Sequence, residues 1–242
     1  MIRALLASLC LLAVPAAASA AKPPVVVEFY TAQGCAACAQ ANDYVNSLAE
    51  RPGVLALTFA VDYWDYLGWE DTFALPAFAE RQKAYLTPLS LREPYTPQLV
   101  INGASEASAV EPEKVEALLE AAAERQVPAP DILFIGQRRV DVGTGRAPRG
   151  GADVWLIRYD PRPENVAVRR GENRGVTLEQ RNVVREITRL GGWRGRPTAY
   201  SAPEPSQDGL QTLLIVQAPN GGRILAAMPQ TAPPAKPQTA AR

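Results

Sequence analysis

The sequence predicts an α/β fold with an additional β-rich C-terminal segment, and three observations support this class. Residues 25–30 form an apolar run rich in β-branched and aromatic side chains, which is typical of a buried strand. Residues 38–50 place apolar side chains at helical spacing, and residues 54–61 form a second buried strand. Strand, helix and strand in this order predict a parallel pair joined by a crossover. Beyond residue 130 the pattern changes to short strands.

Length and composition limit what the chain can be. It has 242 residues, of which 47% are hydrophobic, so it can bury a sizeable core. Its 25 basic and 25 acidic side chains create no overall field, so we expect neither nucleic acid nor a membrane surface as a partner. The chain contains no histidine, which removes most zinc sites and all Ser-His or Cys-His catalysis. We expect no metal and no cofactor.

The first 20 residues read as a signal peptide, removed near Ala20. Arg3 supplies a positive start, residues 4–14 are apolar, and residues 18–20 are small, as a cleavage site requires. We therefore expect an exported protein, periplasmic or secreted. A lipid-modified Cys10 is the less favoured alternative, because Leu9 is bulky where a small residue is needed.

The elements after the second strand complete a domain over residues 21–126. We expect a helix over 71–86, a strand over 99–101 that ends at an Asn-Gly turn, and a helix over 111–124. Pro-rich residues 127–130 form a linker to the next segment.

Residues 131–228 form the β-rich segment, which we expect to pack on the first domain. Its predicted strands cover residues 132–135, 139–142, 154–159, 166–170, 210–218 and 223–228, and the turn between the last two is a hairpin signal. Residues 177–193 fit helical spacing somewhat better than a long strand. Residues 229–242 have little to bury and are expected to be a disordered tail.

Two cysteines, Cys35 and Cys38, stand where the first strand meets the first helix. They are the only cysteines left once the signal peptide is removed, and an exported protein can keep them as a disulfide. A helix N-terminus stabilises a thiolate, so Cys35 is the expected exposed nucleophile and Cys38, on the same helical face, the resolving thiol. A structural disulfide and a Cu(I) site on two thiolates remain alternatives, whereas a zinc site lacks further ligands.

The strand, the Cys-x-x-Cys motif and the later residues 95–97 (Tyr-Thr-Pro) together resemble thioredoxin. This resemblance covers residues 24–126. It implies that Pro97 is a cis-proline facing the disulfide, and that Thr96 and Pro97 hold the substrate backbone.

A closer resemblance extends over nearly the whole mature chain. Residues 28–35, 63–69, 95–98 and 170–173 resemble an exported bacterial family, domain of unknown function 1223 (DUF1223). The resemblance implies a thioredoxin-like fold and an exported location, but no established substrate. The chain departs from the pattern by carrying alanines at positions 36, 37 and 39, where serines and prolines are common.

Three further features each have two interpretations. Glu28 lies in an otherwise apolar strand. Thioredoxin buries an Asp nearby, and this resemblance implies that Glu28 carries the proton of the resolving thiol. The alternative is that Glu28 reaches solvent or pairs with an arginine. Tyr63 and Trp64 follow the second strand, where ligands bind, and are expected either to bind substrate or to pack the next helix. Residues 169–175 could cover the site or bind an anion, but a solvated hairpin tip is favoured.

The expected function is that of an exported thiol-disulfide oxidoreductase. Its partners would be protein thiols or disulfides, or a redox partner protein. Cys35 and Cys38 would exchange electrons, and Glu28 would carry a proton. The alternative of a different class is a non-catalytic binding module that keeps the scaffold and a structural disulfide.

Overall fold

The computed structural model describes residues 23–125 and 128–230, and the statements below concern these residues. The expected signal peptide over residues 1–20 lies outside the described residues, as does the expected tail beyond residue 230. None of the described helices has both the length and the apolar character needed to cross a membrane.

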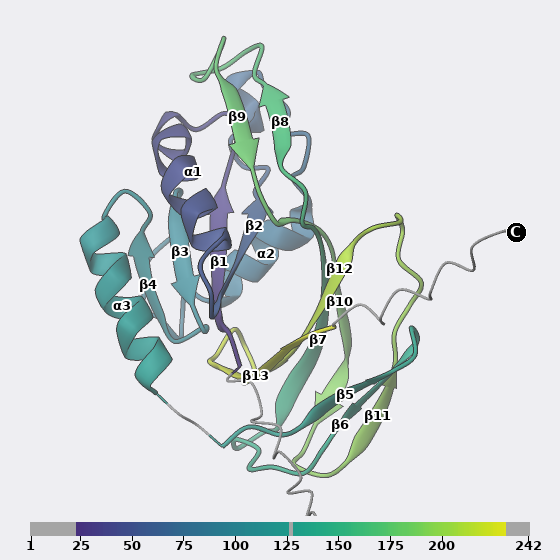
Figure 1. Ribbon diagram of the computed structural model, residues 1–242. Helices are drawn as coiled ribbons and strands as arrows, with labels where there is room; N and C mark the ends of the chain where they lie inside the picture. The colour runs from purple at the N-terminus through teal and green to yellow at the C-terminus, as the bar shows by residue number, and fades with distance from the viewer. Residues whose placement is uncertain (1–22, 126–127, 231–242) are drawn as a thin grey trace, which may run out of the picture.

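A mixed sheet of eight strands runs through the molecule (Figure 1). Its order is β13 (Ile224–Pro229), β12 (Gln211–Gln217), β7 (Ala152–Asp160), β10 (Val183–Trp193), β2 (Val54–Ala60), β1 (Val25–Thr31), β3 (Gln98–Ile101) and β4 (Ser105–Ser108). β1 and β2 are parallel, as the sequence predicts, while β3 runs antiparallel to β1. The expected α/β class with a β-rich C-terminal segment is confirmed.

Two smaller sheets and three helices complete the fold. The three-stranded sheet contains β11 (Thr198–Ser201), β6 (Arg139–Val142) and β5 (Ile132–Ile135), and the two-stranded sheet pairs β8 (Glu164–Ala167) with β9 (Thr177–Gln180). The helices are α1 (Ala36–Ala49), α2 (Pro76–Ala84) and α3 (Pro112–Glu124). α2 and α3 both begin at a proline, which suits the first helical turn because the missing N–H has no partner there. The helix expected from residue 71 therefore starts later.

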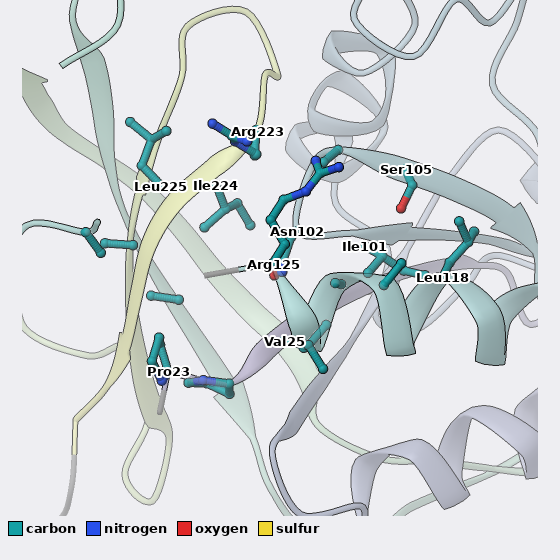
Figure 2. A pocket seen from close by; sticks show the side chains of 18 residues that line it. Pro23, Val25, Ile101, Asn102, Ser105, Leu118, Arg125, Arg223, Ile224 and Leu225 are labelled. Carbon is teal, nitrogen blue, oxygen red and sulfur yellow. The ribbon is translucent and has the colours of Figure 1, made fainter. Parts of the chain in front are cut away.

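The large sheet is covered on both faces. Alternation along β1 sends Val26 and Tyr30 into a core shared with α2, whereas Val27 and Phe29 pack with α1 and α3. Beyond β10, the second face is covered by the three-stranded sheet, whose core centres on Trp193. A pocket opens between α3 and β13 (Figure 2).

The C-terminal segment extends the first domain's sheet edge to edge. β10 lies parallel to β2, with the Thr58 N–H donating to the Asn182 carbonyl at 3.0 Å and the Asn182 side-chain amide donating to the Ala56 carbonyl at 2.8 Å. The core on the α2 side takes residues from both halves, including Phe59 and Ile215. The predicted linker at 127–130 therefore separates two stretches of sequence whose strands share one sheet.

The helix favoured over residues 177–193 is wrong, because this stretch forms β9 and β10. Asn182, with φ of 50°, makes the turn between the strands, and β10 then pairs with β7 along its length. Backbone pairing on both edges of β10 outweighs a weak helical spacing of apolar residues. The predicted tail also begins too early, because Pro229 pairs with Leu213 in the sheet.

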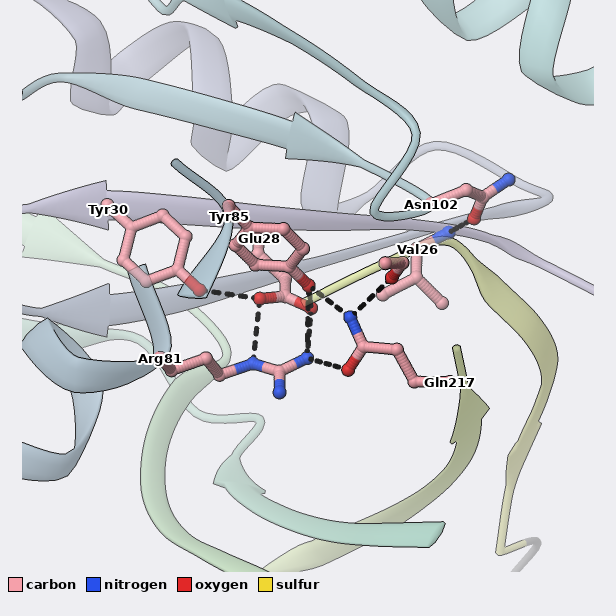
Figure 3. Close-up of polar contacts among 8 residues, drawn as sticks. Val26, Glu28, Tyr30, Arg81, Tyr85, Asn102 and Gln217 are labelled. Atoms are coloured by element: carbon pink, nitrogen blue, oxygen red, sulfur yellow. Dashed lines mark hydrogen bonds and ion pairs between the residues drawn. The ribbon is translucent and has the colours of Figure 1, made fainter. Parts of the chain in front are cut away.

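A buried ion pair joins three elements at the centre of the molecule (Figure 3). Arg81 of α2 donates to the Glu28 carboxylate of β1 through Nε at 2.9 Å and through a terminal nitrogen at 2.6 Å. The hydroxyls of Tyr30 and Tyr85 donate to the same carboxylate at 2.7 and 2.9 Å. Arg81 also donates to Gln217 of β12 at 3.3 Å, so the network links both halves of the chain.

We expect Arg81→Met to lower the free energy of unfolding by about 3–5 kcal/mol, because it leaves the Glu28 carboxylate buried without its cation. Urea unfolding followed by circular dichroism measures the change. The double variant Glu28→Gln/Arg81→Met removes both charges and should recover part of the loss. Lys83→Met, on the same helix but in an exposed pair, should cost less than about 1 kcal/mol. Equal losses for Arg81→Met and Lys83→Met would contradict this role.

Candidate functional site

Cys35 and Cys38 form a disulfide at the N-terminus of α1. Cys35 is the residue that caps the helix, and its Cα lies 5.3 Å from that of Cys38. The Cys35 sulfur accepts a hydrogen bond from the Cys38 backbone N–H at 3.3 Å. This N–H group and the helix dipole would stabilise negative charge on the Cys35 sulfur in the reduced protein.

The loop before β3 faces the disulfide. The Thr96–Pro97 peptide bond is cis, and the Thr96 hydroxyl donates to the Cys35 sulfur at 3.4 Å. The indole N–H of Trp64 donates to the Thr96 hydroxyl oxygen at 2.8 Å. The structure thus brings Cys35, Thr96, Pro97 and Trp64 together, although they lie far apart in the sequence.

The two aromatic residues singled out after β2 occupy different places. Trp64 contacts the site through Thr96, and the exposed ring of Tyr66 stacks on it with centroids 6.5 Å apart. Tyr63 instead donates its hydroxyl to Gln82 of α2 at 3.1 Å, and burial raises the pKa of Tyr63 to about 12. Tyr63 therefore packs against the next helix and also lies beside Thr96, whereas Trp64 borders the disulfide.

Both sulfur-bearing side chains are covered, which corrects the expectation of an exposed Cys35. Cys35 is 2% exposed and Cys38 is 1% exposed. Part of the cover comes from residues 168–176, the loop between β8 and β9, which we call the strap. Its Asn173 amide donates to the carbonyls of Gln33 and Cys35, both at 2.8 Å, and the carboxylate of Glu172 accepts from the Ala36 N–H at 3.2 Å.

The strap reaches the site because β9, the strand that follows it, lies beside α1 (Figure 1). The Asn46 amide of α1 donates to the Glu179 carbonyl of β9 at 2.9 Å, and Arg181 forms an ion pair with Glu50 at 2.8 Å. Asn173 itself is only 4% exposed. The favoured interpretation of residues 169–175 as a solvated hairpin tip is therefore wrong for the middle of the segment.

Gln33, for which the sequence predicts no role, fixes the turn before the disulfide. Its fully buried side chain accepts from the Trp69 indole at 2.9 Å and donates to the Thr72 hydroxyl at 2.9 Å. Its backbone N–H donates to the Asp71 carboxylate at 2.7 Å. The only sequence signal was the position of Gln33 between a buried strand and the cysteines.

Asp71 is a buried carboxylate beside this turn. Burial raises the pKa of Asp71 to about 6, although the N–H groups of Gln33 and Phe73 donate to it and oppose the shift. The helix expected over residues 71–86 would begin at Asp71, yet α2 begins only at Pro76. One of the two donors to Asp71, the Gln33 N–H, comes from the β1–α1 turn, a contact that sequence position alone does not reveal.

Glu28 takes the second of its two interpretations, the arginine partner. It is buried as expected, on the face of β1 that packs with α2, and its carboxylate accepts four hydrogen bonds, two from Arg81 and one each from Tyr30 and Tyr85. Each carboxylate oxygen accepts two of these hydrogen bonds, one from the Arg81 guanidinium and one from a tyrosine hydroxyl. Glu28 therefore belongs to a buried network that stabilises the fold, and its expected role as a proton carrier for Cys38 stays a prediction.

These features define an α/β protein with a Cys-x-x-Cys disulfide at a helix start, faced by a cis-proline. The model of the family "Protein of unknown function (DUF1223)" matches residues 26–217, and the chain belongs to this family. No curated protein matches it. The crystal structure of protein AGR_C_4864 from Agrobacterium tumefaciens is similar, with a TM-score of 0.73, 25% identity and coverage of 90% of this chain and 98% of that one. HBP35 of Porphyromonas gingivalis shares the fold at a TM-score of 0.58 and 12% identity, over 91% and 79% of the two chains.

We expect Asn173→Ala to speed reduction of the disulfide by dithiothreitol about tenfold, because losing two hydrogen bonds to buried carbonyls makes opening of the strap more frequent. The measurement is a time course of thiol alkylation read by mass spectrometry. Arg174→Ala, an exposed neighbour in the same strap, is the control and should not change the rate. Identical rates for all three proteins would mean that the reductant enters by another route.

The raised pKa of Asp71 predicts a pH dependence of stability. The folded protein binds this proton more tightly than the unfolded chain, whose Asp titrates near pH ~3.9, so the stabilisation is present at low pH and is lost as pH rises through about 6. We expect the unfolding free energy of the wild type, minus that of Asp71→Asn, to fall by up to about 3 kcal/mol between pH 4 and 7. Urea titrations with the disulfide oxidised measure it, and a flat difference would contradict the assignment.

Proposed function

We propose that the protein is an exported, thioredoxin-like thiol-disulfide oxidoreductase that uses the Cys35–Cys38 pair. The observation that carries this proposal is the contact between the Thr96 hydroxyl and the Cys35 sulfur at 3.4 Å, directly before cis-Pro97 and at the start of α1. A hydroxyl donor, a backbone N–H and a helix N-terminus all point to the sulfur that would become a thiolate.

The exchange proceeds in two thiol steps. In the reduced protein the Cys35 thiolate attacks one sulfur of a substrate disulfide, that bond breaks, and the other substrate sulfur leaves as a thiolate. Cys38 then loses its proton to solvent and attacks the Cys35 sulfur of the mixed disulfide. The second substrate thiolate leaves, the Cys35–Cys38 bond forms, and two electrons have passed to the substrate. The reverse sequence oxidises a substrate dithiol.

The substrate is a polypeptide that carries a thiol or a disulfide. Its backbone would lie against Thr96 and Pro97, and Trp64 holds the Thr96 hydroxyl in place. Because both cysteines are covered, the strap moves aside when a substrate reaches Cys35. The proposal of export rests on the predicted signal peptide. The molecular mass of the protein purified from the periplasm, measured by mass spectrometry, tests cleavage near Ala20.

One observation favours a second function, that of a non-catalytic binding module. Cys35 and Cys38 are 2% and 1% exposed, which is the environment of a structural bridge. In that case the exposed ring of Tyr66 and its stacking partner Trp64 would contact the bound partner, and the disulfide would only fix the start of α1.

We expect the wild type to reduce insulin disulfides in the presence of dithiothreitol, and Cys35→Ser to be inactive because it lacks the attacking sulfur. Insulin precipitation gives the rate, and equilibration with glutathione buffers gives the reduction potential of the pair. Thr96→Val keeps the shape but removes the hydroxyl donor, and should slow turnover about tenfold. Wild-type turnover no faster than Cys35→Ser, with a potential below about −300 mV, would support the structural bridge instead.

A further inference from the structure

A pocket of about 540 Å³ lies between α3, the start of β1, the β3–β4 turn and the start of β13 (Figure 2). Its volume falls in the range of roughly 300–1,000 Å³ found for small-molecule sites. Val25 at the beginning of β1 lines it, whereas the disulfide follows the other end of the same strand, roughly 20 Å away. The pocket is therefore separate from the site described above.

Apolar residues predominate in the lining of the pocket. α3 contributes Leu118 and three successive alanines, residues 121–123, while β13 contributes Ile224 and two further alanines, residues 226 and 227. Only four of the 18 lining residues are polar, namely Asn102, Ser105, Arg125 and Arg223, and none of the 18 is acidic. Small side chains on both sides leave a groove that an unbranched chain can fill.

Two arginines border this apolar space. Arg125 follows the last turn of α3 and Arg223 precedes β13, and Figure 2 shows both in the upper half of the view, with Val25 and Pro23 below. Neither arginine takes part in any ion pair formed within the described part of the chain. Two unneutralised guanidinium groups beside an acid-free apolar wall favour an anionic group on an apolar body.

We propose that this pocket binds a long-chain carboxylate. The carboxylate head lies on Arg125 and Arg223, and the alkyl chain runs along the alanines of α3 and β13. A guanidinium group matches the two oxygens of a carboxylate, and burial of each CH₂ group adds affinity. A peptide fits less well, because the lining offers few polar groups for its backbone amides.

The proposal is tested by displacing cis-parinaric acid, a fluorescent fatty acid, from the purified protein. The protein is expressed as the full chain. Saturated carboxylates from eight to 16 carbons should compete, with affinity rising about fourfold per CH₂ until the groove is full. Methyl palmitate, which has no charge, should bind at least tenfold more weakly than palmitate.

Variants locate the site. Arg125→Gln and Arg223→Gln should each weaken palmitate at least tenfold and leave methyl palmitate unchanged, whereas the exposed Arg149→Gln should weaken neither. Ala121→Trp fills the groove from an exposed position on α3 and should abolish binding. Ala117→Trp, exposed on the same helix but outside the pocket, is the matched control and should bind normally.

Four results would overturn the proposal: no saturable binding by the wild type, equal affinity for palmitate and its methyl ester, equal binding by the two Trp variants, or binding only to phosphatidylglycerol vesicles. Circular dichroism of each variant shows whether a loss of binding reflects unfolding. If Ala121→Trp is unfolded, the palmitate affinities of the two arginine variants decide whether the proposal stands. A Cys35→Ser/Cys38→Ser double variant should bind palmitate as the wild type does, which keeps this inference independent of the proposed redox function.

Discussion

The ion pair between Glu28 and Arg81 is the interaction on which the arrangement of the molecule depends. A charged pair at 1% and 6% side-chain exposure needs further hydrogen-bond partners to offset its loss of water, and Tyr30, Tyr85 and Gln217 supply them. They come from β1, from the residue that ends α2, and from β12. The pair therefore fixes the helix over the sheet and fixes the C-terminal hairpin against both.

A late segment of the chain reaches the disulfide because the C-terminal strands continue the sheet of the first domain. β10 joins the edge of β2, and the preceding strand β9, paired with β8, lies beside α1. This position delivers Asn173 to the carbonyls of Gln33 and Cys35 and Glu172 to the first N–H of α1. The C-terminal segment is therefore part of the candidate site, since it determines how much of Cys35 a partner can reach.

Much of the fold could be predicted from local pattern, and much of the site could not. Apolar runs, helical spacing and proline positions give β1, β2, α3 and the last hairpin, and the motif around Cys35 and the Thr96–Pro97 pair locate the cysteines and their facing loop. Gln33, Asp71 and Asn173 escaped prediction because their roles depend on partners distant in the chain. Glu28 shows the same limit, since burial follows from its strand but its cation comes from α2.

The most direct test of the account is to trap the mixed disulfide on Cys35. With the resolving sulfur removed, Cys38→Ser should accumulate a covalent adduct with a thiol-bearing protein in the compartment where it resides, visible on a non-reducing gel and abolished by dithiothreitol. Cys35→Ser, with the attacking sulfur removed instead, should form little adduct. Equal adduct formation by both variants, or none by either, would contradict the assignment of Cys35 as the attacking sulfur of a thiol-disulfide oxidoreductase.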